Sequence, residues 1–235
     1  MCGICGEIRF DNTSINRQTA KKMIDAVARR GPDNEGLFFQ KQLFFGHRRL
    51  SVIDVTEKSH QPMTDHSLNI TIVFNGVIYN YKELRNTLQK EGYKFFSDGD
   101  TEVVLKSYHF FGEKCIDHFD GVFAFCVYDG NKRKLFLSRD RLGIKPLYYS
   151  LDSNYFRFSS TTKSLINLEP NQIEIDKISL HYQFTLHSVV PAPRTIIDNI
   201  KKLEPGHSLT VTFDGKIEKE KYYSFDHISL DSTLT

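Results

Sequence analysis

The sequence has few cysteines, no long hydrophobic run and almost no net charge. Four cysteines among 235 residues are too few for a disulfide scaffold, which is typical of a reducing compartment. No apolar stretch approaches the roughly 18 residues of a membrane-spanning helix, and the N-terminus lacks the basic and apolar regions of a secretory signal. The 31 basic and 29 acidic residues nearly cancel. We therefore expect a cytoplasmic protein that binds neither nucleic acid nor membranes and acts on a small molecule.

Several familiar site motifs are also absent. Neither G-x-x-x-x-G-K-[ST] nor G-x-G-x-x-G occurs, so the sequence predicts no phosphate-binding loop of these kinds. The nine histidines form no H-x-x-x-H pair on a helix, and we predict no metal site. Cys2 and Cys5 form a C-x-x-C pair, which leaves zinc binding or redox chemistry open. Cys115 and Cys126 are too far apart to supply a second pair of zinc ligands.

The most informative residue is at position 2. We expect Met1 to be removed before this small residue, so that Cys2 carries a thiol and a free α-amine. An α-amine titrates near ~7.7 to 8.0 and can accept a proton at neutral pH. Nucleophile and base then share one residue, which is the arrangement of N-terminal nucleophiles. Cys2 is therefore the predicted catalytic nucleophile.

The pattern of elements predicts an α+β fold. Short polar turns such as Asp129-Gly130-Asn131 join paired extended segments, which indicates antiparallel hairpins. Between them lie three helical stripes, each with apolar residues on one face. Two antiparallel sheets with helices outside would bury all three stripes. The extended segments are residues 3–10, 36–39, 43–50, 69–74, 121–128, 134–138, 147–150 and 155–159. The stripes are Ala20, Met23, Ile24 and Val27; Tyr81, Leu84 and Leu88; Val104, Tyr108 and Phe111.

The character of the chain changes after residue 168. Four prolines punctuate the remainder, which contains one predicted helix over 178–184 and one predicted hairpin over 207–223. We predict a main domain over 1–168 and a C-terminal extension over 169–235. The extension is either an appendage of the first domain or a connector toward another domain.

Three polar clusters could supply a site. Arg49 could clamp a carboxylate with two parallel hydrogen bonds, or form a surface ion pair. Asn75 and Gly76, placed where an apolar strand is predicted to end, could form an oxyanion hole or a simple turn. Asp100 could bind a substrate ammonium or cap the helix that follows.

Taken in order along the chain, several motifs resemble one known family. The resemblance is to the class II glutamine amidotransferase domain of asparagine synthetases and extends to about residue 223. It implies an N-terminal-nucleophile hydrolase fold, an α-β-β-α sandwich of two antiparallel sheets between helical layers. The motifs are CGI at 2–4, RGPDNEG at 30–36, RLSVID at 49–54, QPM at 61–63, NG at 75–76, GD at 99–100, RDRLGIKPLY at 139–148, VPAPRTI at 190–196 and KLEPGH at 202–207.

The resemblance implies a catalytic role for Cys2, Asn75 and Gly76. Cys2 would attack the side-chain amide of glutamine, and its amine would carry a proton to the leaving ammonia. A glutamyl thioester would then be hydrolysed. The Asn75 side chain and the Gly76 backbone N–H would hold the oxyanion.

The resemblance also implies a substrate-binding set. Arg49 would bind the α-carboxylate of glutamine and Asp100 its α-ammonium, which agrees with the roles proposed from the residues themselves. Leu50 and Val52, which belong to the same motif as Arg49, are expected in the same pocket.

The ammonia would serve an asparagine synthetase-like reaction, from aspartate to asparagine. That reaction needs ATP and magnesium, but the S-G-G-x-D-S loop of the synthetase half does not occur before Thr235. The resemblance thus implies a missing synthetase domain or a separate synthetase subunit. This chain itself is expected to need no cofactor, and it could pair with a second copy of itself.

Two positions depart from the family pattern. The family has Asn-Gly-Glu where this chain has Asn75, Gly76 and Val77, so an acid near the substrate amine is missing. Thr161 and Thr162 stand where the family usually has Glu and Ile. We expect weak binding of glutamine as a result of Val77. The alternative function is a catalytically weakened module that keeps the fold for interaction or regulation.

Overall fold

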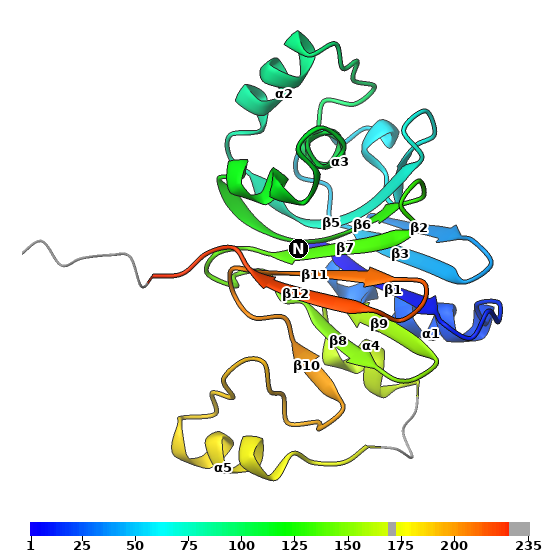
Figure 1. The fold of residues 1–235 in the computed structure, drawn as a ribbon. Helices are drawn as coiled ribbons and strands as arrows, with labels where there is room; N and C mark the ends of the chain where they lie inside the picture. Colours follow the sequence, from blue (N-terminus) through cyan, green and yellow to red (C-terminus); the bar gives the residue numbers. More distant parts are fainter. Residues whose placement is uncertain (169–172, 226–235) are drawn as a thin grey trace, which may run out of the picture.

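Two stacked antiparallel sheets, with helices on both outer faces, make up the molecule (Figure 1). The computed structural model describes residues 1–168 and 173–225. The predicted α+β class and the α-β-β-α layering are confirmed. No helix in these ranges is long and apolar enough to cross a membrane.

The first sheet, sheet A, carries the N-terminal strand near its centre. All of its neighbouring strands pair antiparallel, including β1 with both β3 and β9. Its order is β10 (Ile200–Lys202), β8 (Tyr148–Leu151), β9 (Tyr155–Ser159), β1 (Gly3–Arg9), β3 (Leu43–Arg49) and β2 (Asn34–Phe39).

The second sheet, sheet B, packs against the first. Its strands are also paired antiparallel throughout. The order is β12 (Ile217–Lys221), β11 (His207–Thr212), β7 (Lys134–Arg139), β6 (Gly121–Asp129), β5 (Ile70–Ile78) and β4 (Met63–Asp65).

Helices cover the outer face of each sheet. The helices α1 (Arg17–Ala26) and α4 (Thr162–Ile166) pack on sheet A, whereas α2 (Tyr81–Lys90) and α3 (Asp100–Phe111) pack on sheet B. Their predicted apolar stripes point into these layers, which confirms the three helical patterns. The remaining helical elements are α5 (Lys177–Thr185) and the short segments η1 (Ala28–Arg30), η2 (Glu57–Ser59) and η3 (Gly112–His118).

A third apolar layer fills the space between the sheets. Because side chains alternate along a strand, Ile4 and Ile8 of β1 face this layer while Cys5 faces the layer beneath α1. On β5, Val73 faces the inner layer while Ile72 and Phe74 face the helices. Residues of the same parity as Ile4 and Val73 are therefore directed between the sheets.

Strand β5 is longer than the sequence predicts. We expected the strand to end at Phe74, but it continues to Ile78, with Asn75 opposite Ala124 and Gly76 opposite Phe123. The turn interpretation of Asn75 and Gly76 is therefore wrong. A Cβ at position 76 would lie 2.4 Å from the carbonyl oxygen of Val122, so glycine allows this close pairing.

The segment after residue 168 adds strands to both sheets. Strand β10 extends sheet A beside β8, and the predicted hairpin over 207–223 forms β11 and β12 at the edge of sheet B. The predicted helix over 178–184 is confirmed as α5. That the extension leads toward a synthetase domain stays a prediction, and part of it, residues 169–172 and 226–235, lies outside the described residues.

Candidate active site

The predicted site residues lie together in one pocket. Its volume is about 200 Å³, and its wall comes from the residues before β1, the end of β3 and the loop after it, β5, the start of α3 and the loop after β7. All seven predicted residues are among those that line it. The lining consists of Met1, Cys2, Arg49, Leu50, Val52, Ile53, Ser59, Gln61, Phe74, Asn75, Gly76, Val77, Gly99, Asp100, Thr101 and Lys145.

The Cys2 thiol is held by the backbone of Leu50. The N–H of Leu50 points at Cys2 Sγ over 3.4 Å, and the sulfur lies 3.7 Å from the Leu50 carbonyl oxygen. Burial raises the pKa of the Cys2 thiol above its ordinary value, although the contact with Leu50 acts in the opposite direction. The thiol is therefore protonated at neutral pH, and a nucleophilic reaction at Cys2 requires a nearby base.

Asn75 presents an unused hydrogen-bond donor. Its side chain shares the inner face of β5 with Val73 and is 1% exposed. Among the described residues, no acceptor lies within hydrogen-bond distance of Asn75 Nδ2. An unpaired buried amide carries a desolvation cost, and a ligand that supplies an acceptor would remove it.

Gly76 presents a second donor at the free edge of β5. The N–H of Phe74 donates to Gln61 Oε1 at 2.6 Å, and the N–H of Ile78 donates to Asp100 Oδ2 at 3.1 Å. Gly76 lies between them, so its N–H points to the same edge. On the β6 side of β5, the N–H and the carbonyl oxygen of Phe123 form hydrogen bonds with Asp140 and not with Gly76. The Gly76 N–H is thus directed at the pocket wall that also holds Asn75.

Arg49 closes another side of the pocket. It ends β3 and is only 4% exposed, which rules out the surface ion pair considered above. Its guanidinium donates to the carbonyl oxygens of Asp54 and of Thr56, the latter at 2.9 Å. Two of its five N–H groups are used in this way, so others are left for an anion.

Asp100 begins α3 and does not cap it. The residue in the N-cap position is Gly99, and the Asp100 carboxylate reaches instead to Ile78 of β5. The helix-cap interpretation is therefore wrong. Burial raises the pKa of Asp100 to about 6, because hydrogen bonds from Ile78 and the helix start offset only part of the cost of a buried charge. A buried carboxylate at this position favours a cationic ligand.

The two departures from the family pattern lie in different places. Val77 lines the pocket on the same face of β5 as Asn75, so the missing acid would have entered the pocket. Thr161 and Thr162 are not part of the lining; Thr161 precedes α4 and Thr162 begins it.

Sequence reasoning missed Lys145, which joins the lining from the loop after β7. The neighbouring Asp140 folds this loop, since its carboxylate accepts hydrogen bonds from the backbone N–H groups of Leu142, Ile144 and Lys145 at 2.9 to 3.1 Å. The run RDRLGIKPLY contains these residues. These residues come near Cys2 only because of the way the two sheets pack, and the sequence of the run does not predict that packing.

The zinc or redox interpretation of Cys2 and Cys5 finds no support in the geometry. Cys5 lies beneath α1, whereas the alternation along β1 directs Cys2 to the opposite, inner face. Both are free thiols. Within residues 1–168 and 173–225, no group of three or more His, Cys, Asp or Glu side chains is placed to hold a metal ion.

A cysteine at position 2 that faces a pocket between two antiparallel sheets is the arrangement of an N-terminal-nucleophile hydrolase of the class II amidotransferase type. Residues 1–223 match the model of the glutamine amidotransferase domain family, and the chain belongs to this family. The predicted family resemblance is thereby confirmed.

Curated relatives carry the names of asparagine synthetases. The chain is 40% identical over 226 residues to asparagine synthetase [glutamine-hydrolyzing] 1 of Bacillus subtilis, a match that covers 95% of this chain and 35% of the relative. It is 40% identical over 246 residues to a putative asparagine synthetase of Methanocaldococcus jannaschii, covering 96% of this chain and 47% of the relative. The chain therefore spans about a third to a half of the length of these relatives.

A solved structure supports the fold. Glutamine phosphoribosylpyrophosphate amidotransferase from B. subtilis superimposes with a TM-score of 0.70 at 15% identity, covering 94% of this chain and 49% of that chain. This likeness confirms the N-terminal-nucleophile sandwich.

Proposed function

We propose that this chain hydrolyses glutamine to glutamate and ammonia through a thioester on Cys2. The observation that carries the proposal is the pair of free donors beside the thiol. Asn75 Nδ2 has no acceptor among the described residues, and the Gly76 N–H points to the pocket edge. Two such donors stabilise the negative oxygen that forms when a nucleophile adds to an amide carbonyl.

The reaction begins with proton transfer inside the first residue. The α-amine of Cys2 takes the thiol proton as the sulfur attacks the amide carbon of glutamine. The carbon–nitrogen bond then breaks, and the amine passes the proton to the departing ammonia. Water adds to the thioester, releases glutamate and restores the thiol. The raised pKa of the Cys2 thiol makes this internal base necessary.

Removal of Met1 prepares the site in two ways. With Met1 in place, the nitrogen of Cys2 is part of a peptide bond and cannot act as a base. Met1 also lines the pocket, so its loss enlarges the space beside the thiol.

Arg49 and Asp100 orient the substrate. The remaining N–H groups of Arg49 bind the α-carboxylate of glutamine, and the buried carboxylate of Asp100 binds its α-ammonium. Leu50 and Val52 line the same pocket and offer apolar contacts to the side-chain carbons. Together these groups place the amide carbon at the sulfur of Cys2.

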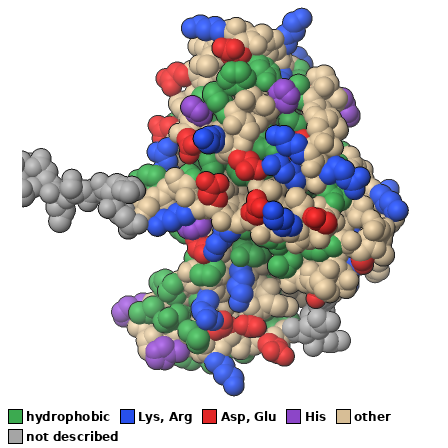
Figure 2. All heavy atoms as spheres, in the orientation of Figure 1, with side chains coloured by type: hydrophobic (Ala, Val, Ile, Leu, Met, Phe, Trp, Pro, Cys, Tyr) green, Lys and Arg blue, Asp and Glu red, His purple; other side chains and the backbone are tan. Residues whose placement is uncertain are grey.

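The ammonia serves the conversion of aspartate to asparagine in a synthetase domain or subunit. The relatives named asparagine synthetase extend well beyond the length of this chain, which supports such a partner. ATP and magnesium act in that partner, and this chain requires no cofactor. The unpaired thiols of Cys2 and Cys5 support a cytoplasmic setting. On the face in Figure 2, acidic and basic side chains are interspersed.

The test is glutamate release from glutamine by the purified chain, with Cys2→Ala as the control. We expect turnover by the natural sequence and none by the variant. N-terminal mass analysis establishes in the same sample whether Met1 is absent. A processed chain that folds and releases no glutamate at any glutamine concentration would contradict the proposal.

One observation favours a second function. Val77 replaces the acid expected beside the substrate amine, which supports a weakened module kept for interaction or regulation. If the chain is such a module, it releases no glutamate even at a saturating concentration of glutamine, so the same assay separates the two functions.

A further inference from the structure

Asp54 lies in the loop between β3 and η2 and makes four hydrogen bonds through its carboxylate. Oδ1 accepts from the N–H and the hydroxyl of Thr56, at 3.2 and 2.6 Å. Oδ2 accepts from the Ser59 hydroxyl at 2.6 Å and from the backbone N–H of Asp98 at 2.8 Å. The φ of Asp54 is +46°, a left-handed conformation that aspartate tolerates better than most residues. The loop is thus folded around one carboxylate.

On one side this loop holds Arg49. The guanidinium of Arg49 donates to the carbonyl oxygens of Asp54 and Thr56, which the Asp54 carboxylate fixes in position. The direction of the remaining Arg49 donors therefore depends on the fold of the loop.

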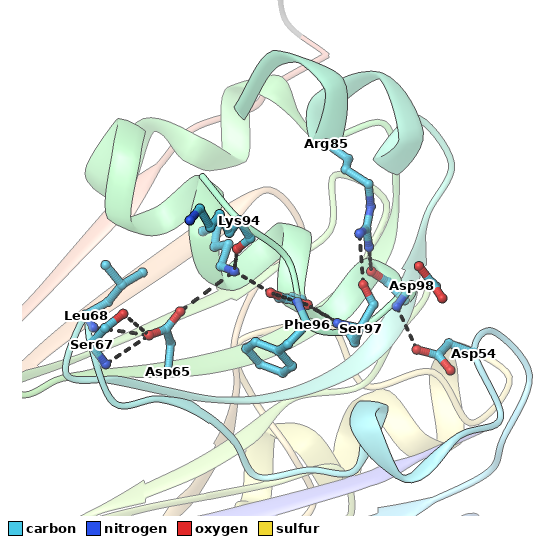
Figure 3. Close-up of polar contacts among 12 residues, drawn as sticks. Asp54, Asp65, Ser67, Leu68, Arg85, Lys94, Phe96, Ser97 and Asp98 are labelled. Carbon is cyan, nitrogen blue, oxygen red and sulfur yellow. Dashed lines mark hydrogen bonds and ion pairs between the residues drawn. The ribbon is translucent and has the colours of Figure 1, made fainter. Parts of the chain in front are cut away.

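On the other side the same carboxylate holds the residues before Asp100. The contact from Asp54 to the N–H of Asp98 crosses from one loop to the next, as Figure 3 shows. From the opposite side, Arg85 of α2 donates to the carbonyl oxygens of Ser97 and Gly99 at 2.8 and 2.9 Å. The turn before Asp100 is therefore held by hydrogen bonds to both Asp54 and Arg85.

These hydrogen bonds keep the carboxylate of Asp54 ionised. Burial acts to raise its pKa, but the hydrogen bonds from Ser59, Thr56 and Asp98 outweigh burial and hold the pKa well below its usual range. Asp54 is therefore ionised at every pH at which the protein would work. An ionised acceptor makes stronger hydrogen bonds than a neutral one.

We propose that Asp54 is a positioning residue that fixes the spacing between Arg49 and Asp100, and so selects substrates that carry both an α-carboxylate and an α-ammonium. The inference rests on the proposed function, in which these two residues bind the two α groups of glutamine. Asp54 contacts neither the thiol nor the oxyanion donors in the described structure. Its effect is on substrate recognition and leaves the reactivity of Cys2 unchanged.

The experiment compares two reagents on the Asp54→Asn variant. The first is a diazoketone analogue of glutamine that keeps both α groups, and the second is iodoacetamide, which has neither. Asparagine has an NH2 group in place of one carboxylate oxygen, and this group accepts no hydrogen bond. Either the contacts from Thr56 or the contact from Asp98 is therefore lost. The rate of Cys2 labelling is followed by mass spectrometry, since the other three cysteines are buried.

We expect labelling by the analogue to slow about tenfold or more, and labelling by iodoacetamide to change less than about twofold. Equal slowing of both reagents would show a general collapse of the pocket and overturn the inference, as would no change with either. Glu57→Gln is the matched control, because it removes an exposed acid from η2, directly after the same loop, and should alter neither rate.

Two further outcomes are distinguishable. If Asp54→Asn does not fold, Thr56→Val removes one donor to the same carboxylate from a residue outside the pocket lining and must show a smaller loss confined to the analogue. If the natural sequence itself is not labelled by the analogue while iodoacetamide labels Cys2, the proposed function fails, independently of Asp54.

Discussion

The carboxylate of Asp100 accepts a hydrogen bond from the backbone N–H of Ile78 at 3.1 Å, which ties the start of α3 to the end of β5. Two segments that lie far apart in the sequence thereby meet at the pocket. The N–H groups of Phe74 and Ile78 are occupied by side chains, and that of Gly76 between them faces the pocket. One contact thus places the acid that we propose for the substrate amine and leaves the N–H of Gly76, the proposed oxyanion donor, free beside it.

The first prediction concerns the pH dependence of glutamine binding. Because burial raises the pKa of Asp100 to about 6, the carboxylate loses its charge below that pH and no longer pairs with an ammonium. In the Cys2→Ala variant, which binds without turnover, we expect the Kd for glutamine to rise about tenfold per pH unit below 6. Calorimetric titration measures this. Adding Asp100→Asn should weaken binding at pH 7 and remove the dependence; if the dependence persists, another group is responsible.

The second prediction concerns Asn75. Asn75→Ala removes one of the two proposed oxyanion donors, so we expect kcat for glutamine hydrolysis to fall about 10²- to 10³-fold with little change in KM. Steady-state glutamate release measures both constants. Iodoacetamide labelling of Cys2 should keep its rate, which shows that the thiol is intact. A rise in KM without loss of kcat would assign Asn75 to ground-state binding instead.

The third prediction concerns the missing acid. Val77→Glu restores a carboxylate on the inner face of β5, and we expect KM for glutamine to fall about ten- to a hundredfold through a charge-assisted hydrogen bond. Val77→Gln is the matched control, with similar size and no charge. Equal KM values for the two variants and the natural sequence would show that this position does not reach the substrate amine.

The fourth prediction concerns stability in acid. His47 of β3 is fully buried, and burial lowers its pKa to about 3, although Nε2 lies 3.3 Å from the carbonyl oxygen of Phe74. The unfolded chain takes up a proton near 6.5, so stability from neutral His47 is present above that pH and is lost as the pH falls toward 3.

Denaturant unfolding at pH 7 and pH 5 measures this effect. Between these values the natural sequence should lose about 2 kcal/mol more of its free energy of unfolding than His47→Gln does. His66→Gln, an exposed histidine, should behave like the natural sequence. Parallel losses in all three proteins would place the acid sensitivity elsewhere.

Much of the fold follows from local patterns, and the limits of prediction have physical causes. The stripe of Ala20, Met23 and Ile24 is legible because helix periodicity is local, and α1 buries all three residues. Asn75 and Gly76 are poor strand formers, so the sequence predicts the end of β5 too early. Pairing with β6 through Ala124 and Phe123 extends the strand in spite of this propensity.

Only some residues of the candidate site could likewise be predicted from the sequence. Cys2 could be recognised without any geometry, since its two functional groups share one residue. Lys145 and Ser59 could not, because neither belongs to a strand or long helix with a recognisable period. Their positions depend on the way the carboxylates of Asp140 and Asp54 fold the backbone around them. Asp100 was recognised as a candidate, yet its contact with Ile78 depends on how α3 packs against sheet B.

The addition of β10 and β11 to the sheets has a practical consequence. A chain shortened to residue 168 would uncover the long side of β7, where β11 now supplies partners from Thr212 to Ser208. Unpaired backbone groups along an apolar strand recruit other chains. Such a truncated protein would therefore tend to self-associate and precipitate, so any recombinant version of this chain needs to retain the hairpin that ends at Lys221.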